Sequence, residues 1–310
     1  MIPVSVRENL FKYIGEEADA FILSSTALLE KYTKTWQLSH LTFMPTDTVN
    51  LLFSCHSALY GPCVLKICIL GLEVATEINC LRAYDNQGYV KLWEYETADH
   101  ILLLAHVNPG SQLWEVSDYQ QRASLFATTL KNLQMIPTTE KTYPTYEKWL
   151  KKVRQNLIEE ENLEEFIIYL DEALKTYKML QPSYPNTFLL HGDLHQENLL
   201  LNNENTYTII DPKGVVDMPV METARFLLNE MPCETKKLQK MIAIISEILE
   251  IPTGDLIKSL FIDVILANSW TMEEHVASKE IFEQNKQQAL TDCKFIAEFL
   301  HKNQSKEAYL

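Results

Sequence analysis

The N-terminal third of the chain is built from short runs of apolar and β-branched residues, a pattern that predicts β-strands. Turn signals such as MPTDT, YGP and DNQG separate these runs. The predicted strands span residues 36–44, 49–55, 63–70, 88–95 and 100–107. Residues 71–84, between the third and fourth strands, repeat apolar side chains at helical spacing, and residues 5–32 predict one or two helices ahead of the first strand. We therefore expect the order helix, three strands, helix, two strands.

Helical periodicity dominates after the segment NPGSQ, residues 108–112. The predicted helices span residues 117–135, 144–160, 162–181, 219–231, 234–249, 255–278 and 279–302. Residues 188–214, FLLHGDLHQENLLLNNENTYTIIDPKG, are the exception and predict a strand, a polar loop and a hairpin. The pattern predicts an α+β protein with a β-rich part over residues 1–107 and a mostly helical part over residues 108–310.

Composition and charge narrow the range of partners. The hydrophobic content of 46% suits a globular protein, and the six cysteines form no C-x-x-C pair, which predicts buried, reduced thiols in a cytoplasmic protein. The chain begins without a signal-peptide pattern and has no apolar run near the ~18 residues that span a bilayer, so we expect no membrane association. The 42 carboxylates against 27 Lys and Arg residues, a net charge of -15, argue against nucleic acid and favour a cationic small molecule. No sequence signal sets an oligomeric state.

The polar stretch HGDLHQENLLL, residues 191–201, concentrates the candidate chemistry. Asp193 and His195 fit the D-x-H ligand pair of a two-metal phosphoesterase, but none of the eight glycines is followed by the Asn of the G-N-H motif that such a site also needs. Asp193 or Asn198 alone would fit a structural loop in which the side chain hydrogen-bonds to nearby backbone. Only the combination of these residues favours a catalytic loop.

His191, Asp193, Leu194 and Asn198 have the spacing of the protein-kinase catalytic loop, H-x-D-L-x-x-x-N. Asp211 follows a short hairpin, as the magnesium-binding Asp does in kinases. Phosphoryl transfer needs a carboxylate that orients the attacking hydroxyl and accepts its proton, and it needs magnesium on the phosphate oxygens. Amide and carboxylate oxygens, as in Asn198 and Asp211, are suitable ligands for that hard cation.

The segments LLHGDLHQENLL and IIDPKGVVDMPVMETARFL resemble the aminoglycoside and hydroxyurea phosphotransferase family, whose characteristic text is close to HGDLHxxNVL and IDPKPVVGDPxxDxARFL. The resemblance extends upstream to VLKI, to E-x-x-x-L-R and to LLLxxxxPG, and covers most of the chain from about residue 36. It implies a protein-kinase-like fold with a small β-rich N-terminal lobe and a larger helical C-terminal lobe. It also implies ATP and Mg²⁺ as cofactors and a small-molecule hydroxyl acceptor.

The resemblance assigns nucleotide contacts to the N-terminal part. Lys66 in VLKI would hold the α- and β-phosphates, and Glu77 would pair with Lys66. Each residue also has a structural alternative: Lys66 could lie at a strand edge and reach solvent, and Glu77 could lie on a solvated helix face. Glu73, one turn earlier, is a rival partner. Ala105 and Val107 would offer backbone groups to adenine, although this chain has LLLAH where the family usually has LLLER.

Other parts of the family pattern match less closely. The expected phosphate-covering loop, MPTDTVN, contains no glycine, so Thr46, Thr48 and Asn50 would either contact phosphate or form an ordinary hairpin turn. Asp217-Met218 replaces Gly-Asp, and Glu222 replaces Asp. These departures affect the local support of the site and the acceptor pocket.

Four residues are candidates for acceptor binding: His195, Trp270, Glu273 and Glu274. The last three lie within about one helical turn, and the family has a similar Trp-then-Glu helix at its acceptor pocket. Carboxylates there would bind amines or guanidinium groups, and the indole would add a cation–π contact. A solvated acidic face with a core Trp is the alternative. His191 is expected to support the loop.

The resulting hypothesis is an ATP- and magnesium-dependent O-phosphotransferase of the aminoglycoside type acting on a cationic acceptor such as streptomycin. Asp193 orients or deprotonates the acceptor hydroxyl, Asn198 and Asp211 hold magnesium, and Lys66 with Glu77 positions the phosphates. One alternative is a metabolite kinase for an amino alcohol, a sugar or an amino acid. Another is a nucleotide-binding pseudokinase scaffold, which would have no need for Asp193.

Overall fold

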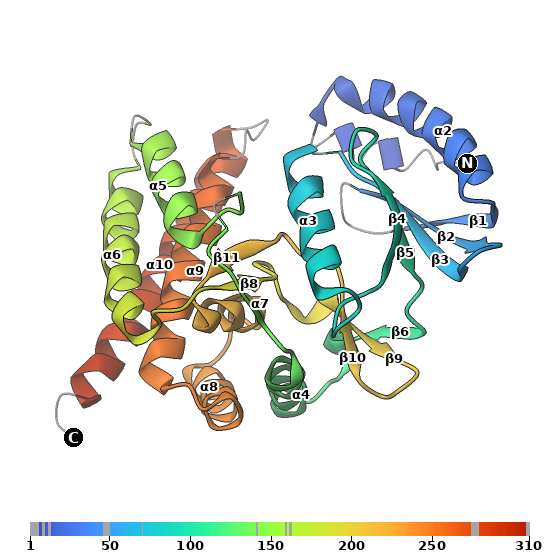
Figure 1. Cartoon of the computed structure of the whole chain (residues 1–310). Helices are drawn as coiled ribbons and strands as arrows, with labels where there is room; N and C mark the ends of the chain where they lie inside the picture. The colour runs from blue at the N-terminus through green and yellow to red at the C-terminus, as the bar shows by residue number, and fades with distance from the viewer. Residues whose placement is uncertain are drawn as a thin grey trace. The chain divides into compact units, whose positions relative to one another are not determined.

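A computed structural model describes residues 6–307, except residues 8–9, 12–13, 46–49, 70, 141, 159, 161–162 and 274–278. The chain divides into two compact units (Figure 1). The first unit contains residues 1–111 and 200–213, and the second contains residues 112–199 and 214–310.

The first unit is organised around an antiparallel sheet of five strands in the order β1-β2-β3-β5-β4 (Figure 1). The strands are β1 (Leu38–Met44), β2 (Leu51–Ser57), β3 (Gly61–Ile67), β4 (Leu92–Glu96) and β5 (Ile101–Ala105). All five predicted strands are therefore present, with ends shifted by a few residues. The predicted segment 88–95 enters its strand late, because Tyr89 and Val90 pair with Ile209 instead.

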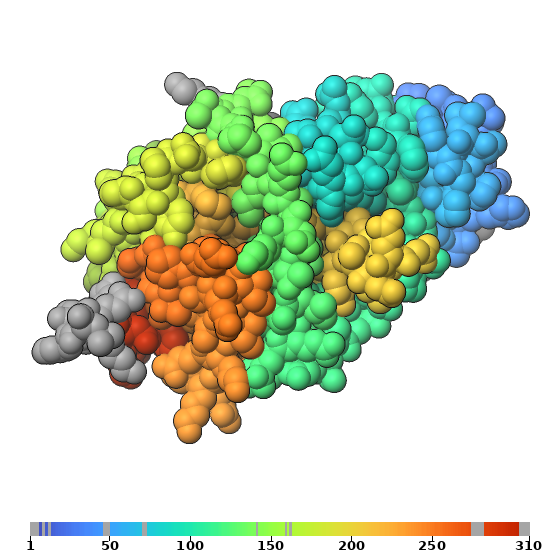
Figure 2. All heavy atoms as spheres, turned by 60° about the horizontal axis from the view of Figure 1, so that its bottom comes forward, coloured from blue at the N-terminus to red at the C-terminus, as the bar shows by residue number. Residues whose placement is uncertain are grey.

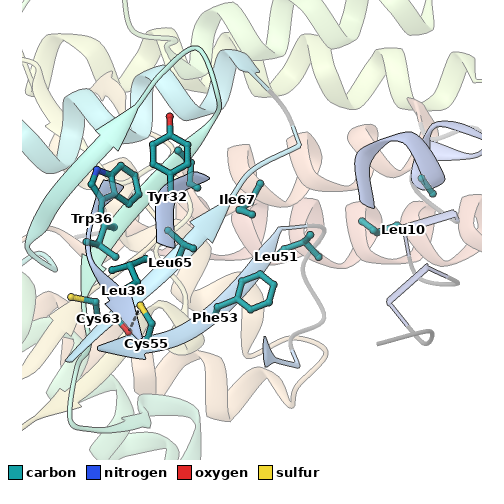
Figure 3. Close-up of a cluster of buried hydrophobic side chains, with 13 residues drawn as sticks. Leu10, Tyr32, Trp36, Leu38, Leu51, Phe53, Cys55, Cys63, Leu65 and Ile67 are labelled. Carbon is teal, nitrogen blue, oxygen red and sulfur yellow. Dashed lines mark hydrogen bonds between the residues drawn. The ribbon is translucent and has the colours of Figure 1, made fainter. Parts of the chain in front are cut away.

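One face of this sheet carries a hydrophobic core that helix α2 (Glu17–Thr35) helps to cover. Tyr32 near the end of α2 and Trp36 just after it belong to the same cluster of buried side chains as Phe53 and Leu65 of the sheet (Figure 3). Leu51, Phe53 and Cys55 alternate with more exposed residues along β2, which is the period-two pattern of a half-buried strand. Burying an aliphatic or aromatic side chain of this kind contributes about 1.5–3 kcal/mol to folding.

The hairpin of β9 (Leu199–Asn202) and β10 (Tyr207–Ile209) belongs to the first unit from residue 200 onward, although it follows the catalytic-loop sequence. Strand β9 also pairs with β6 (Pro109–Gln112), and Ile209 exchanges backbone hydrogen bonds with Gly88 and Val90. Figure 2 shows the hairpin surface (gold) beside the cyan and teal surface of the N-terminal residues. The order of elements along the chain had assigned this hairpin to the mostly helical part. The lobe boundary between residues 107 and 108 remains a proposal.

The second unit is mostly helical. Its helices are α4 (Tyr119–Asn132), α5 (Tyr146–Leu157), α6 (Glu164–Leu180), α7 (Ala224–Asn229), α8 (Thr235–Leu249), α9 (Thr253–Glu273) and α10 (Lys279–Glu307). Helix α9 contacts α5, α6, α7, α8 and α10, and is buried on nearly all sides between residues 255 and 266. A helix that is apolar all round is typical of such a central position. These helices and the N-terminal antiparallel sheet confirm the α+β class.

A small antiparallel sheet and short 3₁₀ turns complete the second unit. The sheet has the order β11-β8-β7, with β7 (Ile136–Pro137), β8 (Phe188–Leu190) and β11 (Val215–Asp217). The 3₁₀ turns are η1 (Leu113–Glu115), η2 (Gln181–Ser183), η3 (Gln196–Asn198) and η4 (Pro219–Thr223). The predicted helix 219–231 therefore begins as η4, where Pro219 lies in the first turn, and continues as α7. In the described part of the chain, no helix combines the length and the apolar character needed to cross a membrane.

A buried ionic network joins α4, η3, α7 and α8. Arg122 makes two hydrogen bonds of 2.7 Å to the carboxylate of Glu230, which also accepts hydrogen bonds from Gln196 (3.0 Å) and Lys237 (2.8 Å). Burial opposes ionisation of Glu230, but Arg122 and Lys237 outweigh it and hold the pKa of this carboxyl below its ordinary value. The network stabilises the turn that carries Asn198.

We expect Glu230→Gln to lower the free energy of unfolding by about 3–5 kcal/mol, because it leaves the buried Arg122 guanidinium without its counter-charge. Urea unfolding measures this loss. The difference between wild type and Glu230→Gln should shrink on acidification. The pKa of Glu230 is lower in the folded protein than in the unfolded chain, so its ionised carboxylate stabilises the fold above the unfolded-state pKa. This contribution is lost as the pH falls through the lowered, folded-state pKa.

Lys131→Ala is the matched control on the same helix, because it breaks the exposed pair of Lys131 with Glu250. Exposed pairs contribute about 0–1 kcal/mol. Equal losses for the two variants would contradict the account of the buried network.

Candidate active site

The first unit brings Lys66 and Glu77 together. Lys66 lies on β3, in the interior of the sheet order, and Glu77 lies on α3 (Gly71–Tyr84). The Nζ atom of Lys66 donates to both carboxylate oxygens of Glu77, at 2.8 and 2.9 Å, and both residues are about 95% buried, with exposed fractions of 4% and 5%. The rival Glu73 instead accepts a 3.1 Å hydrogen bond from Lys213 at the surface. Lys66 is thus not an edge residue, and its partner on α3 is Glu77.

Asp211 completes this cluster. Its carboxylate accepts a hydrogen bond from Lys66, and its side chain is 35% exposed. Its φ of +58° lies in the left-handed region, which Asp tolerates better than most residues. Burial lowers the pKa of Lys66, but the carboxylates of Glu77 and Asp211 outweigh this effect and raise the pKa well above its ordinary value. The cluster therefore places the ammonium of Lys66 next to the partly exposed carboxylate of Asp211.

The end of β5 contains the residues expected to contact adenine. The N–H groups of Ala105 and His106 donate to the carbonyls of Lys91 and Pro62, so both are already used within the first unit. Among the described residues, no hydrogen bond takes up the N–H of Val107. Gly110 follows with a φ of +79°, and a Cβ there would lie 2.9 Å from the carbonyl oxygen of Val107. A glycine at this position therefore leaves the backbone around Val107 unobstructed.

In the second unit, the candidate catalytic loop leaves β8 through a tight turn at Gly192. Its φ is +80°, and a Cβ at this position would lie 2.3 Å from the Cγ2 atom of Val215. Val215 belongs to β11 and pairs directly with Leu190, the last residue of β8. Only glycine fits here, because both the left-handed backbone and the contact with β11 exclude a side chain.

Glu222 anchors the backbone of this turn. Its carboxylate accepts hydrogen bonds from the N–H of His191 at 2.7 Å and of Gly192 at 3.2 Å. Burial, together with a smaller effect of the nearby Asp193 carboxylate, raises the pKa of Glu222 to about 7 against the opposing effect of the two N–H donors. The family pattern has Asp here, and the longer Glu reaches the same loop backbone.

The interior of the loop is held by its own polar groups. Fully buried His191 accepts the N–H of Asp193 at Nδ1 (3.1 Å), which agrees with the expected supporting role. The amide nitrogen of Asn198 donates to the carbonyl of Asp193 (3.0 Å) and lies 3.2 Å from Nε2 of His195. Since a carbonyl only accepts hydrogen bonds, the first contact fixes the orientation of the Asn198 amide and distinguishes its nitrogen, the donor, from its oxygen, Oδ1. The predicted residues Asp193, His195 and Asn198 therefore share one loop.

Sequence reasoning missed Arg225 and Asp263. The Nε atom of Arg225 lies 3.4 Å from Oδ1 of Asp193 and 3.0 Å from Oδ2 of Asp263, and Nη2 donates to Oδ1 of Asp263 at 3.1 Å. Burial disfavours the charge on Arg225, but Asp263 and Asp193 raise its pKa above the ordinary value. A single carboxylate within the apolar run LFIDVIL was the available signal for Asp263.

The expected acceptor residues are only partly in the described region. Trp270 stands edge-on to Trp149, with ring centroids 5.4 Å apart, and its ring lies 5.6 Å from the guanidinium carbon of Arg225. Glu273 accepts a 2.6 Å hydrogen bond from Asn156. Glu274 lies outside the described residues, as do Thr46 and Thr48 of the expected phosphate loop. Trp270 is therefore linked to Asp193 through Arg225.

The donor types of the predicted magnesium ligands suit that cation. Asn198 offers an amide oxygen and Asp211 a carboxylate oxygen, and magnesium in kinases takes one or two such protein ligands together with water and phosphate oxygens. Within the described residues, no group of three or more His, Cys, Asp and Glu side chains is arranged to hold a metal ion.

Comparison with known proteins identifies relatives of the whole region that contains these residues. The streptomycin 6-kinase of Streptomyces griseus is 23% identical over 224 residues, which cover 70% of this chain and 71% of the relative. The hydroxyurea phosphotransferase of Kitasatospora aureofaciens is 24% identical over 242 residues, covering 74% and 68%.

Solved structures show the same fold at low sequence identity. A choline kinase of Streptococcus pneumoniae has a TM-score of 0.63 at 16% identity, over 87% of this chain and 98% of its own. A thermostable mutant of aminoglycoside phosphotransferase APH(4)-Ia has a TM-score of 0.57 at 12% identity, over 87% and 97%. The predicted protein-kinase-like fold is confirmed. The family model for "Aminoglycoside/hydroxyurea antibiotic resistance kinase" matches residues 36–274. The chain therefore belongs to this kinase family, whose members transfer phosphate to hydroxyl groups.

Proposed function

We propose that this protein transfers the γ-phosphoryl group of ATP to a hydroxyl of a small cationic acceptor, with streptomycin as the first candidate. The loop around Asp193 carries the proposal. Its backbone is held by Glu222, His191 and Gly192, so that a partly exposed carboxylate, that of Asp193, follows a well-anchored turn. Preorganised groups of this kind lower the barrier of phosphoryl transfer mainly through positioning and electrostatics.

In this proposal, Asp193 orients the acceptor hydroxyl and accepts its proton as the oxygen attacks phosphorus. The bond between the γ-phosphorus and the β–γ bridging oxygen breaks, and ADP leaves with the bridging oxygen. A binding module would not need the carboxylate of Asp193, which argues against a scaffold.

Lys66 is proposed to bind the α- and β-phosphates, with Glu77 fixing the position of its ammonium group. The backbone carbonyl of Ala105 and the N–H of Val107 are proposed to bind adenine, which the unbonded N–H of Val107 supports. Asn198 and Asp211 are proposed to supply oxygen ligands to magnesium. Magnesium neutralises phosphate charge in kinases of this type.

The acceptor is proposed to be cationic because the chain carries a net charge of -15 and Glu273 offers a carboxylate next to Trp270. The ring of Trp270 already faces the guanidinium of Arg225. A cation on the acceptor would therefore pair with Glu273 or Glu274 more readily than with the indole. His195 is proposed to contact the acceptor from within the loop.

Streptomycin should stimulate ADP release in the presence of Mg²⁺, and Asp193→Asn should reduce this turnover by roughly 10²–10⁴-fold, which is the usual contribution of a general base. A coupled ADP assay with other aminoglycosides, hydroxyurea, choline and sugars as parallel acceptors identifies the preferred class. Asp193→Asn should still bind ATP about as well as the wild type, as measured by the thermal shift that ATP induces.

Preferential turnover of neutral hydroxyurea or sugars would contradict the cationic acceptor. The absence of turnover with every acceptor, together with the absence of a nucleotide-dependent thermal shift, would contradict the kinase.

Glu77→Gln should lower kcat/KM for ATP by roughly 100-fold, because a misplaced ammonium of Lys66 loses its alignment with the phosphates. Steady-state kinetics at varied ATP concentration measures this change. Glu73→Gln is the matched control one helical turn earlier, and it should stay within about twofold, since the ion pair of Glu73 with Lys213 lies at the surface. Comparable losses in the two variants would show that Glu77 has no special role.

A further inference from the structure

We propose that Arg225 is a positioning residue that holds the carboxylate of Asp193, and that Asp263 and Trp270 hold Arg225 in place. The inference rests on the proposed function, in which Asp193 acts on the acceptor hydroxyl. Neither Arg225 nor Asp263 belongs to the kinase loop motif.

Asp263 provides the fixed point. It lies in the middle of α9, is fully buried, and is surrounded along the helix by apolar residues. A buried carboxylate without a partner costs several kcal/mol, so such a residue persists in an apolar helix only when a cation is paired with it. Arg225, near the start of α7, supplies that cation through Nε and Nη2, at 3.0 and 3.1 Å.

The guanidinium group is positioned between two carboxylates. Its Nε atom lies 3.0 Å from Asp263 and 3.4 Å from Oδ1 of Asp193. In this geometry the buried Nε–H completes a hydrogen bond with neither, and Oδ2 of Asp263 also lacks one. A small rotation of either carboxylate would complete one of these bonds. A purely structural ion pair would be satisfied by Asp263 alone.

Aromatic packing limits how far Arg225 can move. The ring of Trp270 lies 5.6 Å from its guanidinium carbon, and Trp149 meets Trp270 edge-on with an interplanar angle of 77°. Trp149 also lies against the loop, because a Cβ on Gly192 would be 3.5 Å from its ring. The guanidinium therefore has a fixed position relative to the loop.

This arrangement gives Asp193 a defined orientation. Contact of Oδ1 with Arg225 leaves Oδ2 as the oxygen that accepts the proton of the acceptor hydroxyl. The planar fork of Arg allows simultaneous contact with both carboxylates, whereas the ammonium of Lys is a point charge without this geometry. Arg225 acts on the reaction through Asp193 and takes no part in binding ATP.

The test uses the full chain and measures ADP release from MgATP, with streptomycin and with water as the acceptor. Arg225→Lys and Asp263→Asn should each lower kcat by roughly 10–100-fold, as expected for a catalytic group displaced by a fraction of an ångström to 1 Å. The KM for ATP should stay within about twofold, since the nucleotide contacts are unchanged.

Chemical rescue separates positioning from a structural role. Ethylguanidinium chloride at millimolar concentration should raise the kcat of Arg225→Ala by at least about tenfold. The same additive should leave the kcat of Asp193→Asn unchanged. Arg154→Ala is the matched control, because it removes another Arg–Asp pair of the second unit, with Asp171, at a more exposed place. Its activity should be close to wild type with or without the additive.

The outcomes distinguish the two proposals. Wild-type protein without any ADP release would overturn the proposed function and this inference with it. If the wild type is active and Arg225→Lys keeps the wild-type kcat, the inference alone is overturned. The inference alone is also overturned if Arg225→Ala folds and ethylguanidinium does not raise its lowered kcat. If Arg225→Ala does not fold, the kcat and the KM for ATP of Arg225→Lys decide whether Arg225 is a positioning residue.

Discussion

The carboxylate of Glu222 holds the backbone at the start of the candidate catalytic loop. Two consecutive backbone N–H groups, of His191 and Gly192, would be buried without an acceptor if this side chain were absent. A buried N–H without a partner costs about 1–3 kcal/mol, so the loop adopts the turn that satisfies both. Gly192 permits that turn, because Val215 leaves no room for a Cβ. Asp193 and Asn198 come after this turn in the chain, so their backbone starts from a fixed position.

Several buried charged side chains pair with groups of opposite charge in the same unit. In the first, Lys66 is shared between Glu77 and Asp211. In the second, Arg122 pairs with Glu230, and Arg225 pairs with Asp263. Desolvation makes such pairs poor sources of net stability, but removing one member is costly, so their geometry is specific. The same constraint that preserves the fold therefore also orients the groups proposed for phosphate binding and proton transfer.

Much of the site was accessible from spacing. H-x-D-L-x-x-x-N defined the loop because its motif residues lie within eight positions and interact through local backbone geometry. The distinction between Glu73 and Glu77 was not accessible, since both lie on the same helix one turn apart and only the position of β3 selects Glu77. Arg225 and Asp263 are 38 residues apart in sequence, and no local pattern connects them.

The sequence by itself determined the α+β class, the strands and helices, and the kinase-like loop, because hydrophobic periodicity and short-range spacing are local properties of a chain. Only the tertiary structure decided that the hairpin of residues 200–213 belongs with the N-terminal sheet, through hydrogen bonds of Ile209 to Gly88 and Val90. It also decided that Glu222 anchors the loop and that Arg225 lies between Asp193 and Asp263. These choices depend on which distant groups share a buried environment, where unpaired polar atoms are costly and long-range partners must be found.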